Sequence, residues 1–204
     1  MIIGITGGIA SGKSTVTNFL RDRACLVIDA DQIVRRHQLA GGRLYQLLLD
    51  HLGAVILTPD GQLDRVRLGK RFFEDPTLRT WSDKYQGDMI REILFEEMKS
   101  AQDHSPLVFM DIPLLFEQGY ADWFDEIWVL SISKEEQLQR LMKRDGFDLD
   151  AAQARIASQM PLEEKLAGAT VILDNSGSEE GLRKQVEIEL ERLLQSEKED
   201  SVSL

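Results

Sequence analysis

Short apolar runs alternate along this chain with longer amphipathic ones. That rhythm is typical of strands joined by helical crossovers, so we predict an α/β fold with a mostly parallel sheet. Each candidate strand is short and rich in β-branched or aromatic residues, as buried parallel strands are. Five segments fit this description: Ile2–Thr6, Leu26–Asp29, Leu107–Ile112, Glu126–Ile132 and Thr170–Leu173.

The amphipathic segments predict helices that begin near Gly12, Asp31, Lys134, Leu149 and Glu179. Residues 41–100 contain no clear strand pattern. Helical spacing relates Leu44, Leu47, Leu48 and Leu52, a strong turn follows at Thr58–Gly61, and Leu78–Met98 can be helical. We therefore expect a helical insertion between the second and third strands, and a flexible tail over residues 196–204.

Composition and charge narrow the class of protein. The chain has 204 residues, of which 43% are hydrophobic, so one domain with a sizeable core is expected. The formal net charge of -11 disfavours long-range attraction to nucleic acid or to anionic lipid. An anionic ligand must therefore be held by local groups.

The single cysteine and the absence of long apolar segments indicate the cellular compartment in which the protein is expected. Cys25 alone cannot form an internal disulfide and suits a reducing compartment, although its simplest role is that of a small buried residue entering a strand. No signal-peptide pattern opens the sequence, and no apolar stretch approaches the roughly 20 residues that span a bilayer. We expect a cytoplasmic protein without a membrane or nucleic-acid partner.

Residues 7–15 read GGIASGKST and match G-x-x-x-x-G-K-[ST], directly after a predicted strand and before a helical apolar run. Such a P-loop turns its N–H groups inward and ends at a helix N-terminus, which together bind phosphates. Lys13 would reach the β- and γ-phosphates, and Ser14 would ligate Mg²⁺. The predicted nucleotide-binding residues here are Gly8, Ala10, Ser11, Gly12, Lys13, Ser14 and Thr15.

Carboxylates end the second and third predicted strands. Either Asp29 or Asp31 could orient an acceptor hydroxyl or take its proton, because ligands of doubly wound sheets bind beyond the strand carboxyl ends. Either could instead cap the following helix. Asp111 could hold Mg²⁺, or it could fix the Ile112–Pro113 turn. Glu117 follows on an expected helix, where a solvated or structural role is equally open.

Arg140 and Arg144 share one face of the helix after the fourth strand, and Arg155 begins the next helical stretch. Arginine suits a lid that neutralises phosphate charge, but these side chains could equally form a solvated face paired with Glu136 and Asp148. The other candidate residues each have a structural alternative to a role in binding. Trp81, Tyr85 and Phe95 could line an acceptor cleft or pack in a core, Asn175 could border adenine or form a turn, and His37, His51 and His104 lack metal-ligand spacing.

Several segments beyond the P-loop resemble the dephospho-CoA kinases, from Ile2 to about Gly177. The matching segments are Thr6–Ile9, Asp29–Asp31, Asp111–Glu117, Gln137–Leu141, Arg155–Gln159 and Asp174–Gly177. The resemblance implies a three-layer P-loop kinase fold with a five-stranded parallel sheet, a helical lid over about residues 134–166 and a helical CoA-binding insertion over about 41–100.

The same resemblance implies transfer of the ATP γ-phosphoryl group to the ribose 3′-hydroxyl of dephospho-CoA, with Mg²⁺ as cofactor. It points to Asp31, Lys13 and Arg140 as catalytic residues. It assigns Arg140, Arg144 and Asn175 to ATP, and Ser14 and Asp111 to the metal. The expected acceptor residues are Thr6, Asp31, Tyr85, Arg91, Pro113 and Leu114, while the oligomeric state is not predicted.

Three positions depart from the family's pattern. Ala10 replaces a usual glycine, and its methyl group is tolerable only if the backbone φ is negative. Gln86-Gly87 replaces a His-Pro pair, and Thr170 replaces an aspartate before the last strand. Because the sequence shows the donor site more clearly than the acceptor pocket, a kinase for another nucleoside or small alcohol is an alternative function. A nucleotide-regulated switch is a second alternative, although the sequence has no Asn-Lys-x-Asp segment for guanine.

Overall fold

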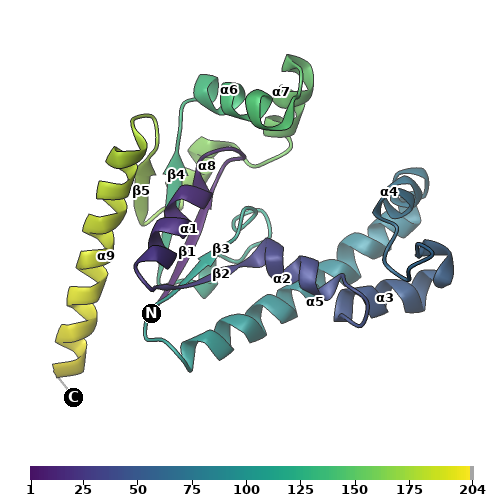
Figure 1. Cartoon of the computed structure of the whole chain (residues 1–204), viewed down its shortest axis with the longest axis horizontal. Helices are drawn as coiled ribbons and strands as arrows, with labels where there is room; N and C mark the ends of the chain where they lie inside the picture. Colours follow the sequence, from purple (N-terminus) through teal and green to yellow (C-terminus); the bar gives the residue numbers. More distant parts are fainter. Residues whose placement is uncertain (203–204) are drawn as a thin grey trace. The chain divides into compact units, whose positions relative to one another are not determined.

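The computed structural model describes the backbone of residues 1–202 and the side chains of residues 1–196. Its five strands form one sheet in the order β2-β3-β1-β4-β5 (Figure 1). They are β1 (Ile2–Gly7), β2 (Leu26–Asp29), β3 (Val108–Asp111), β4 (Glu126–Ser131) and β5 (Val171–Asp174). Strand β1 pairs in parallel with β3 and β4, and β4 pairs in parallel with β5. The predicted five-stranded parallel sheet is confirmed.

The five helices whose starts were predicted begin within one residue of the expected positions, and four further helices are present among the described residues. The helices are α1 (Lys13–Asp22), α2 (Ala30–His37), α3 (Arg43–Leu52), α4 (Arg65–Glu74), α5 (Pro76–Gln102), α6 (Lys134–Asp145), α7 (Leu149–Ala157), α8 (Leu162–Ala167) and α9 (Glu179–Val202), with short 3₁₀ turns at Ala54–Ile56 and Ala121–Trp123. Those whose starts were predicted are α1, α2, α6, α7 and α9. Much of the predicted tail, 196–204, continues α9 as far as Val202; its last two residues lie outside the described part, and its flexibility stays a prediction.

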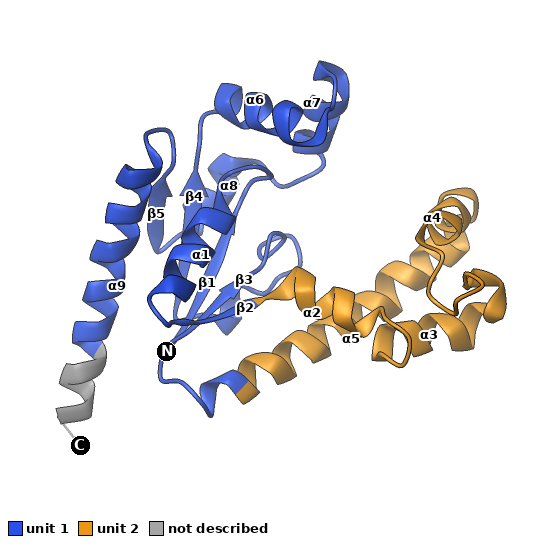
Figure 2. Ribbon diagram, in the orientation of Figure 1, with its two compact units in different colours: residues 1–28, 101–204 blue, residues 29–100 orange. Residues whose placement is uncertain are grey.

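The chain divides into two compact units (Figure 2). Unit 1 comprises residues 1–28 and 101–204, and unit 2 comprises residues 29–100. The first holds most of the sheet, the phosphate loop and the expected lid. The second contains the predicted insertion together with α2.

Side chains on the two faces of the sheet pack against different layers of unit 1. Ile3 and Ile5 of β1 are fully buried in a core that α1 and α9 complete. Gly4 faces the other way, where an added Cβ would meet Leu115 at 2.7 Å. The alternation of a strand thus places helices on one face and the turns after β3 on the other, giving three layers.

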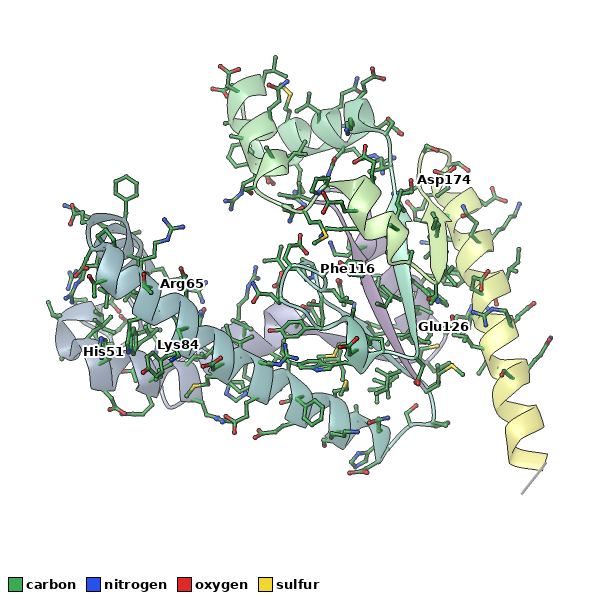
Figure 3. The ribbon with its side chains drawn as sticks, turned by 180° about the vertical axis from the view of Figure 1, so that it is seen from behind. His51, Arg65, Lys84, Phe116, Glu126 and Asp174 are labelled. Atoms are coloured by element: carbon green, nitrogen blue, oxygen red, sulfur yellow. The ribbon has the colours of Figure 1, made fainter. Side chains whose placement is uncertain are left out.

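The strand register brings four connecting segments to one edge of this sheet. Ile5 lies opposite Asp111, Gly7 opposite Leu130, and Ser131 opposite Asp174. The chain therefore leaves β1, β3, β4 and β5 on the same side, where ligands of such sheets bind. Figure 3 shows Asp174 at this edge and Glu126, the first residue of β4, at the opposite one.

Unit 2 is helical, as predicted. Leu48, Ile56 and Leu68 form its small core with partly buried neighbours that include Trp81. Within its described residues the only β pairing is an isolated bridge between Leu57 and Leu63, closed by the predicted turn, in which the Gly61 N–H donates to the Thr58 carbonyl at 2.9 Å. No helix in the described part of the chain combines the length and apolarity that membrane crossing needs.

Candidate functional site

The loop between β1 and α1 has the geometry of an anion site. After β1 the chain makes a turn, closed by a 3.1 Å hydrogen bond from the Ser11 N–H to the Gly8 carbonyl. Gly12 then caps α1 with a φ of +96°, a left-handed conformation that favours glycine. The first N–H groups of α1 have no acceptor within the helix and lie at its positive dipole end. Together these groups form a phosphate-binding loop.

Gln137, in the second turn of α6, packs directly on this loop. Its side chain is 4% exposed, and its Nε2 donates to the Ile9 carbonyl at 2.9 Å. A Cβ added to Gly8 would lie 2.5 Å from that nitrogen. A side chain at position 8 would therefore displace the Gln137 amide from the Ile9 carbonyl.

Two further amide side chains hold the loop. Gln159, just beyond α7, accepts a hydrogen bond from the Ile9 N–H at 2.8 Å. Asn175, just beyond β5, is buried and donates from its Nδ2 to the Ser11 carbonyl at 2.7 Å. A Cβ on Gly12 would lie 2.2 Å from this Nδ2. The side chain of Asn175 thus supports the loop, a role that neither of its sequence-based interpretations included.

The structure corrects the expectation for Ala10. Its φ is +59°, whereas we expected the methyl group to require a negative φ. Ala10 is the third residue of the Gly8–Ser11 turn, and Ile9 before it is not among the residues with positive φ. The turn is therefore of type II, which demands a positive φ at its third residue. An alanine in this conformation costs about 1 kcal/mol relative to glycine.

Arg140 lies beside the loop, and it also makes the ion pair that the alternative interpretation foresaw. Its Nη2 donates to Glu136 Oε1 at 3.1 Å and to the Asn175 carbonyl at 3.0 Å. Its Nη1 is 3.9 Å from the position that a Cβ on Gly12 would occupy. The guanidinium thus borders the N-terminus of α1, where phosphates would bind, while its contact with ATP stays a prediction.

Arg144 and Arg155 are not brought to the loop by any hydrogen bond among the described residues. Arg144 pairs with Asp145 through bonds of 2.7 and 2.8 Å rather than with Glu136 or Asp148. These bonds hold the pKa of the Asp145 carboxyl below its usual value. Arg155 is exposed on α7. Of the three arginines, only Arg140 borders the predicted phosphate site.

Asp29 and Asp31 have different local roles. Asp29 is the N-cap of α2, and its Oδ1 accepts a hydrogen bond from the Gln32 N–H at 3.0 Å. Asp31 is exposed in the first turn, and among the described residues its carboxylate makes no hydrogen bond or ion pair. Asp29 is therefore occupied as a cap, while the Asp31 carboxylate remains available to a ligand.

Ser14 and Asp111 are the predicted metal ligands. Ser14 is exposed in the first turn of α1, and Asp111 is the half-buried last residue of β3, beside β1 in the sheet. A hydroxyl and a carboxylate are oxygen donors of the kind that Mg²⁺ prefers, and one or two such groups suffice when phosphates complete its shell. The residues therefore fit the ion by their chemistry.

A buried ion pair anchors the turns after β3. Lys165 of α8 is fully buried, and its Nζ donates to Glu117 Oε1 at 2.7 Å and to the Pro113 carbonyl at 3.1 Å. Glu117 also accepts from the Met160 N–H at 3.1 Å, and Thr6 donates to the Pro113 carbonyl at 3.2 Å. Glu117 is thus structural. The expectation of a helix around it was wrong, because consecutive turns span residues 113–119.

The predicted acceptor residues fall in both units. In unit 1, Thr6 is buried against Pro113, and Leu114 is exposed. In unit 2, Tyr85 and Arg91 are exposed on α5. Their contact with an acceptor stays a prediction.

The candidate aromatic residues of α5 differ in their surroundings, and the histidines of the described part form no metal site. Trp81 stacks on His51 with ring centroids 3.6 Å apart, and Tyr85 lies tilted against Trp81. Phe95 is 43% exposed. Among the described residues, no group of three His, Cys, Asp or Glu side chains has the arrangement of metal ligands.

The two other departures from the family's pattern have structural explanations. Gln86 and Gly87 lie within α5, which continues unbroken, and the Gln86 amide donates to the Ser82 hydroxyl one turn earlier. Thr170 accepts from the Ile127 N–H at 2.6 Å and donates to the Ile127 carbonyl at 2.9 Å. Thr170 therefore fixes the start of β5 against β4.

Sequence interpretation gave no role to Gln137, Gln159 or Lys165, although the first two lie in family-like segments. The signal available for Gln137 was a polar residue one turn before Leu141 on the buried face of α6. For Lys165 no comparable signal exists, since a lysine in a short polar helix normally faces solvent.

Known proteins that are similar to this chain in sequence and in fold are kinases, as a phosphate-binding loop suggests. Residues 1–180 match the sequence model of the dephospho-CoA kinase family. A dephospho-CoA kinase of Streptococcus thermophilus is 51% identical over 186 residues, which cover 91% of this chain and 94% of that protein. The crystallised dephospho-CoA kinase of Campylobacter jejuni superposes with a TM-score of 0.75 at 27% identity, covering 96% of this chain and 98% of the other.

More distant neighbours share the fold alone. A shikimate kinase structure from Aquifex aeolicus has a TM-score of 0.52 at 17% identity and covers 94% of this chain and 96% of its own. The family model covers residues 1–180, a relative is 51% identical, and Gln137, Gln159 and Asn175 hold the phosphate loop in place. The chain therefore belongs to the dephospho-CoA kinase family.

Proposed function

We propose that this protein transfers the γ-phosphoryl group of ATP to the ribose 3′-hydroxyl of dephospho-CoA, giving CoA and ADP. The observation that carries the proposal is the loop between β1 and α1, found in a chain whose family is defined by this reaction. The predicted lid, residues 134–166, excludes water from the reaction, and the insertion, residues 41–100, holds the CoA moiety. We place the reaction in the cytoplasm.

On the donor side, backbone N–H groups of the loop and the N-terminus of α1 bind the polyphosphate. Lys13 neutralises the β- and γ-phosphates as charge redistributes during transfer. Arg140, held by Glu136 and the Asn175 carbonyl, adds a permanent positive charge beside Gly12. Ser14 and Asp111 would hold Mg²⁺, which would supply positive charge to stabilise the phosphate oxygens during transfer.

On the acceptor side, Asp31 orients the 3′-hydroxyl and takes its proton. Its exposed carboxylate has no partner among the described residues, whereas Asp29 is committed to capping α2. Thr6, Pro113, Leu114, Tyr85 and Arg91 are the residues proposed to contact dephospho-CoA, and Arg144 is a further proposed contact with ATP.

The direct test is product analysis by mass spectrometry after incubation with MgATP and dephospho-CoA. We expect 3′-phosphorylated product from the wild type and almost none from Lys13→Ala. Phosphate on another nucleoside or small alcohol would instead favour a different kinase. Nucleotide binding without any product would favour a switch.

A matched pair of variants tests the base. Asp31→Asn removes the proton acceptor, so we expect turnover to fall by about 10²–10⁴ with ATP affinity little changed. Asp29→Asn removes the same charge two residues away but keeps an equally good helix cap, so its turnover should stay near wild type. Equal losses in the two variants would reject Asp31 as the base.

A further inference from the structure

Both hydrogen-bonding groups of Ile9 are held by glutamines from the lid region. Gln137 donates to the Ile9 carbonyl at 2.9 Å, and Gln159 accepts from the Ile9 N–H at 2.8 Å. Strand pairing explains why Gln137 is so placed, since Gly7 lies opposite Leu130 and the loop and α6 leave adjacent strands. Ile9 precedes Ala10, whose positive φ is unfavourable for alanine.

The carbonyl that Gln137 holds belongs to the central peptide of the type II turn. Types I and II differ mainly in the direction of this peptide, which rotates by roughly half a turn between them. In type I the third residue has a negative φ, which alanine prefers. Without the hydrogen bond from Gln137, the Ile9–Ala10 peptide should therefore rotate to the type I orientation.

Rotation of this peptide would change the loop in two ways. It would move the Ile9 carbonyl away from the Gln137 amide. It would also redirect the Ala10 N–H, which points opposite to that carbonyl because the peptide is trans. Among the described residues the Ala10 N–H has no protein acceptor, so it is available to a ligand on the side away from Gln137.

We infer that Gln137, supported by Gln159, is a positioning residue that holds the Ile9–Ala10 peptide in its type II orientation, so that the Ala10 N–H can donate to the polyphosphate of the nucleotide. The lid region thereby supplies the conformational preference that a glycine would supply at position 10. This inference deepens the proposed function, because it rests on the loop binding a nucleotide.

Calorimetric titration of the full-length protein with MgADP tests the inference without any acceptor. Gln137→Ala removes one hydrogen bond and frees the peptide, so we expect MgADP affinity to fall about tenfold. Gln139→Ala is the matched control, since Gln139 is an exposed glutamine on the same helix, and its affinity should equal that of the wild type.

The decisive measurement is rescue by glycine. In Gln137→Ala/Ala10→Gly, residue 10 favours the positive φ by itself, so affinity should return to within about threefold of wild type. Ala24→Gly is the control for general stabilisation, because Ala24 also has a positive φ, +58°, but lies beyond the other end of α1. Gln137→Ala/Ala24→Gly should stay as weak as Gln137→Ala.

Three outcomes would overturn the inference. Unchanged MgADP affinity in Gln137→Ala would show that the amide does not position the loop. Equal rescue by both glycine substitutions, or by neither, would reduce Gln137 to a general structural role. No MgADP binding by the wild type would remove the ligand itself, whereas binding with no CoA formed would leave the inference standing and refute only the proposed acceptor.

Discussion

The two units of this protein are both stabilised by ion pairs, but the pairs differ in burial. In unit 1, Lys165 and Glu117 meet at 2.7 Å with side chains that are 0% and 18% exposed. In unit 2, Arg43 reaches Glu96 at 2.8 Å with side chains that are 37% and 59% exposed. Nearly equal distances therefore correspond to very different surroundings.

The difference follows from which segments each ion pair joins. Lys165 and Glu117 join three segments at the ligand edge of the sheet: α8, the Met160 N–H and the turn that begins at Pro113. Leaving either charge unpaired there is costly, so their arrangement is well defined. The pairs of Arg43 join α3 to α5 at the surface, where solvent screens them.

The largest effect is expected from breaking the buried pair. Lys165→Met leaves the Glu117 carboxylate buried without its cation, so the free energy of unfolding should fall by about 3–5 kcal/mol. Chemical denaturation followed by circular dichroism measures this loss. In the same experiment Lys134→Met, which removes the exposed pair with Glu163 at 2.9 Å, should cost less than about 1 kcal/mol.

A second substitution separates lost charge from lost packing. Lys165→Met/Glu117→Gln removes both charges while the glutamine can still accept from the Met160 N–H, so it should recover a large part of the loss. If the double variant were as unstable as Lys165→Met, packing of the lysine stem and not the unpaired carboxylate would account for the effect.

The next effect concerns backbone conformation. Ala10 of unit 1 is an alanine in a conformation that favours glycine, whereas Gly87 of unit 2 is a glycine in a helix, which favours alanine. Gly87 lies inside α5, and an added Cβ would have no neighbour within 4 Å. Gly87→Ala should therefore raise the free energy of unfolding by roughly 0.5–1 kcal/mol, because alanine loses less backbone entropy in a helix. Slower amide hydrogen exchange along α5 would confirm it, and unchanged or faster exchange would contradict it.

Sequence predicted the fold more fully than the site, for a physical reason. Short apolar runs and amphipathic helical patterns are local signals, so the five strands and five of the helix starts could be anticipated. The support of the loop by Gln137 and Gln159 depends on side chains 128 and 150 residues from Ile9. The positive φ of Ala10 was missed for the same reason: residue preference alone favours a negative value, and distant hydrogen bonds override it.

An ion pair of intermediate burial gives a smaller, pH-dependent effect. Arg192 donates to both oxygens of Glu126 at 2.9 and 2.6 Å, joining α9 to β4, and these bonds hold the pKa of Glu126 below its ordinary value of 4.5. The stabilisation is therefore present above that value and is lost as the pH falls through the lower folded-state pKa. At pH 7, Glu126→Gln should cost about 0.5–1 kcal/mol, since Arg192 is partly screened by solvent.

Thermal unfolding at several pH values measures this difference. The gap between wild type and Glu126→Gln should narrow as the pH drops below 4.5, because the wild-type carboxyl then becomes protonated. A gap that stays constant down to the lowest pH at which both proteins fold would show that the charge of Glu126 contributes nothing.

The smallest effect is expected from the surface pairs of unit 2. Arg43→Gln removes the bonds to Glu92 and Glu96, yet all three side chains are more than a third exposed, so the loss should be only a few tenths of a kcal/mol. Added salt screens exposed charges, so the difference between wild type and variant should shrink further at about 1 M salt. Because the burial of Lys165 protects its pair from such screening, the cost of Lys165→Met should change little under the same conditions. A loss from Arg43→Gln as large and as salt-independent as that from Lys165→Met would show that burial does not distinguish the two units.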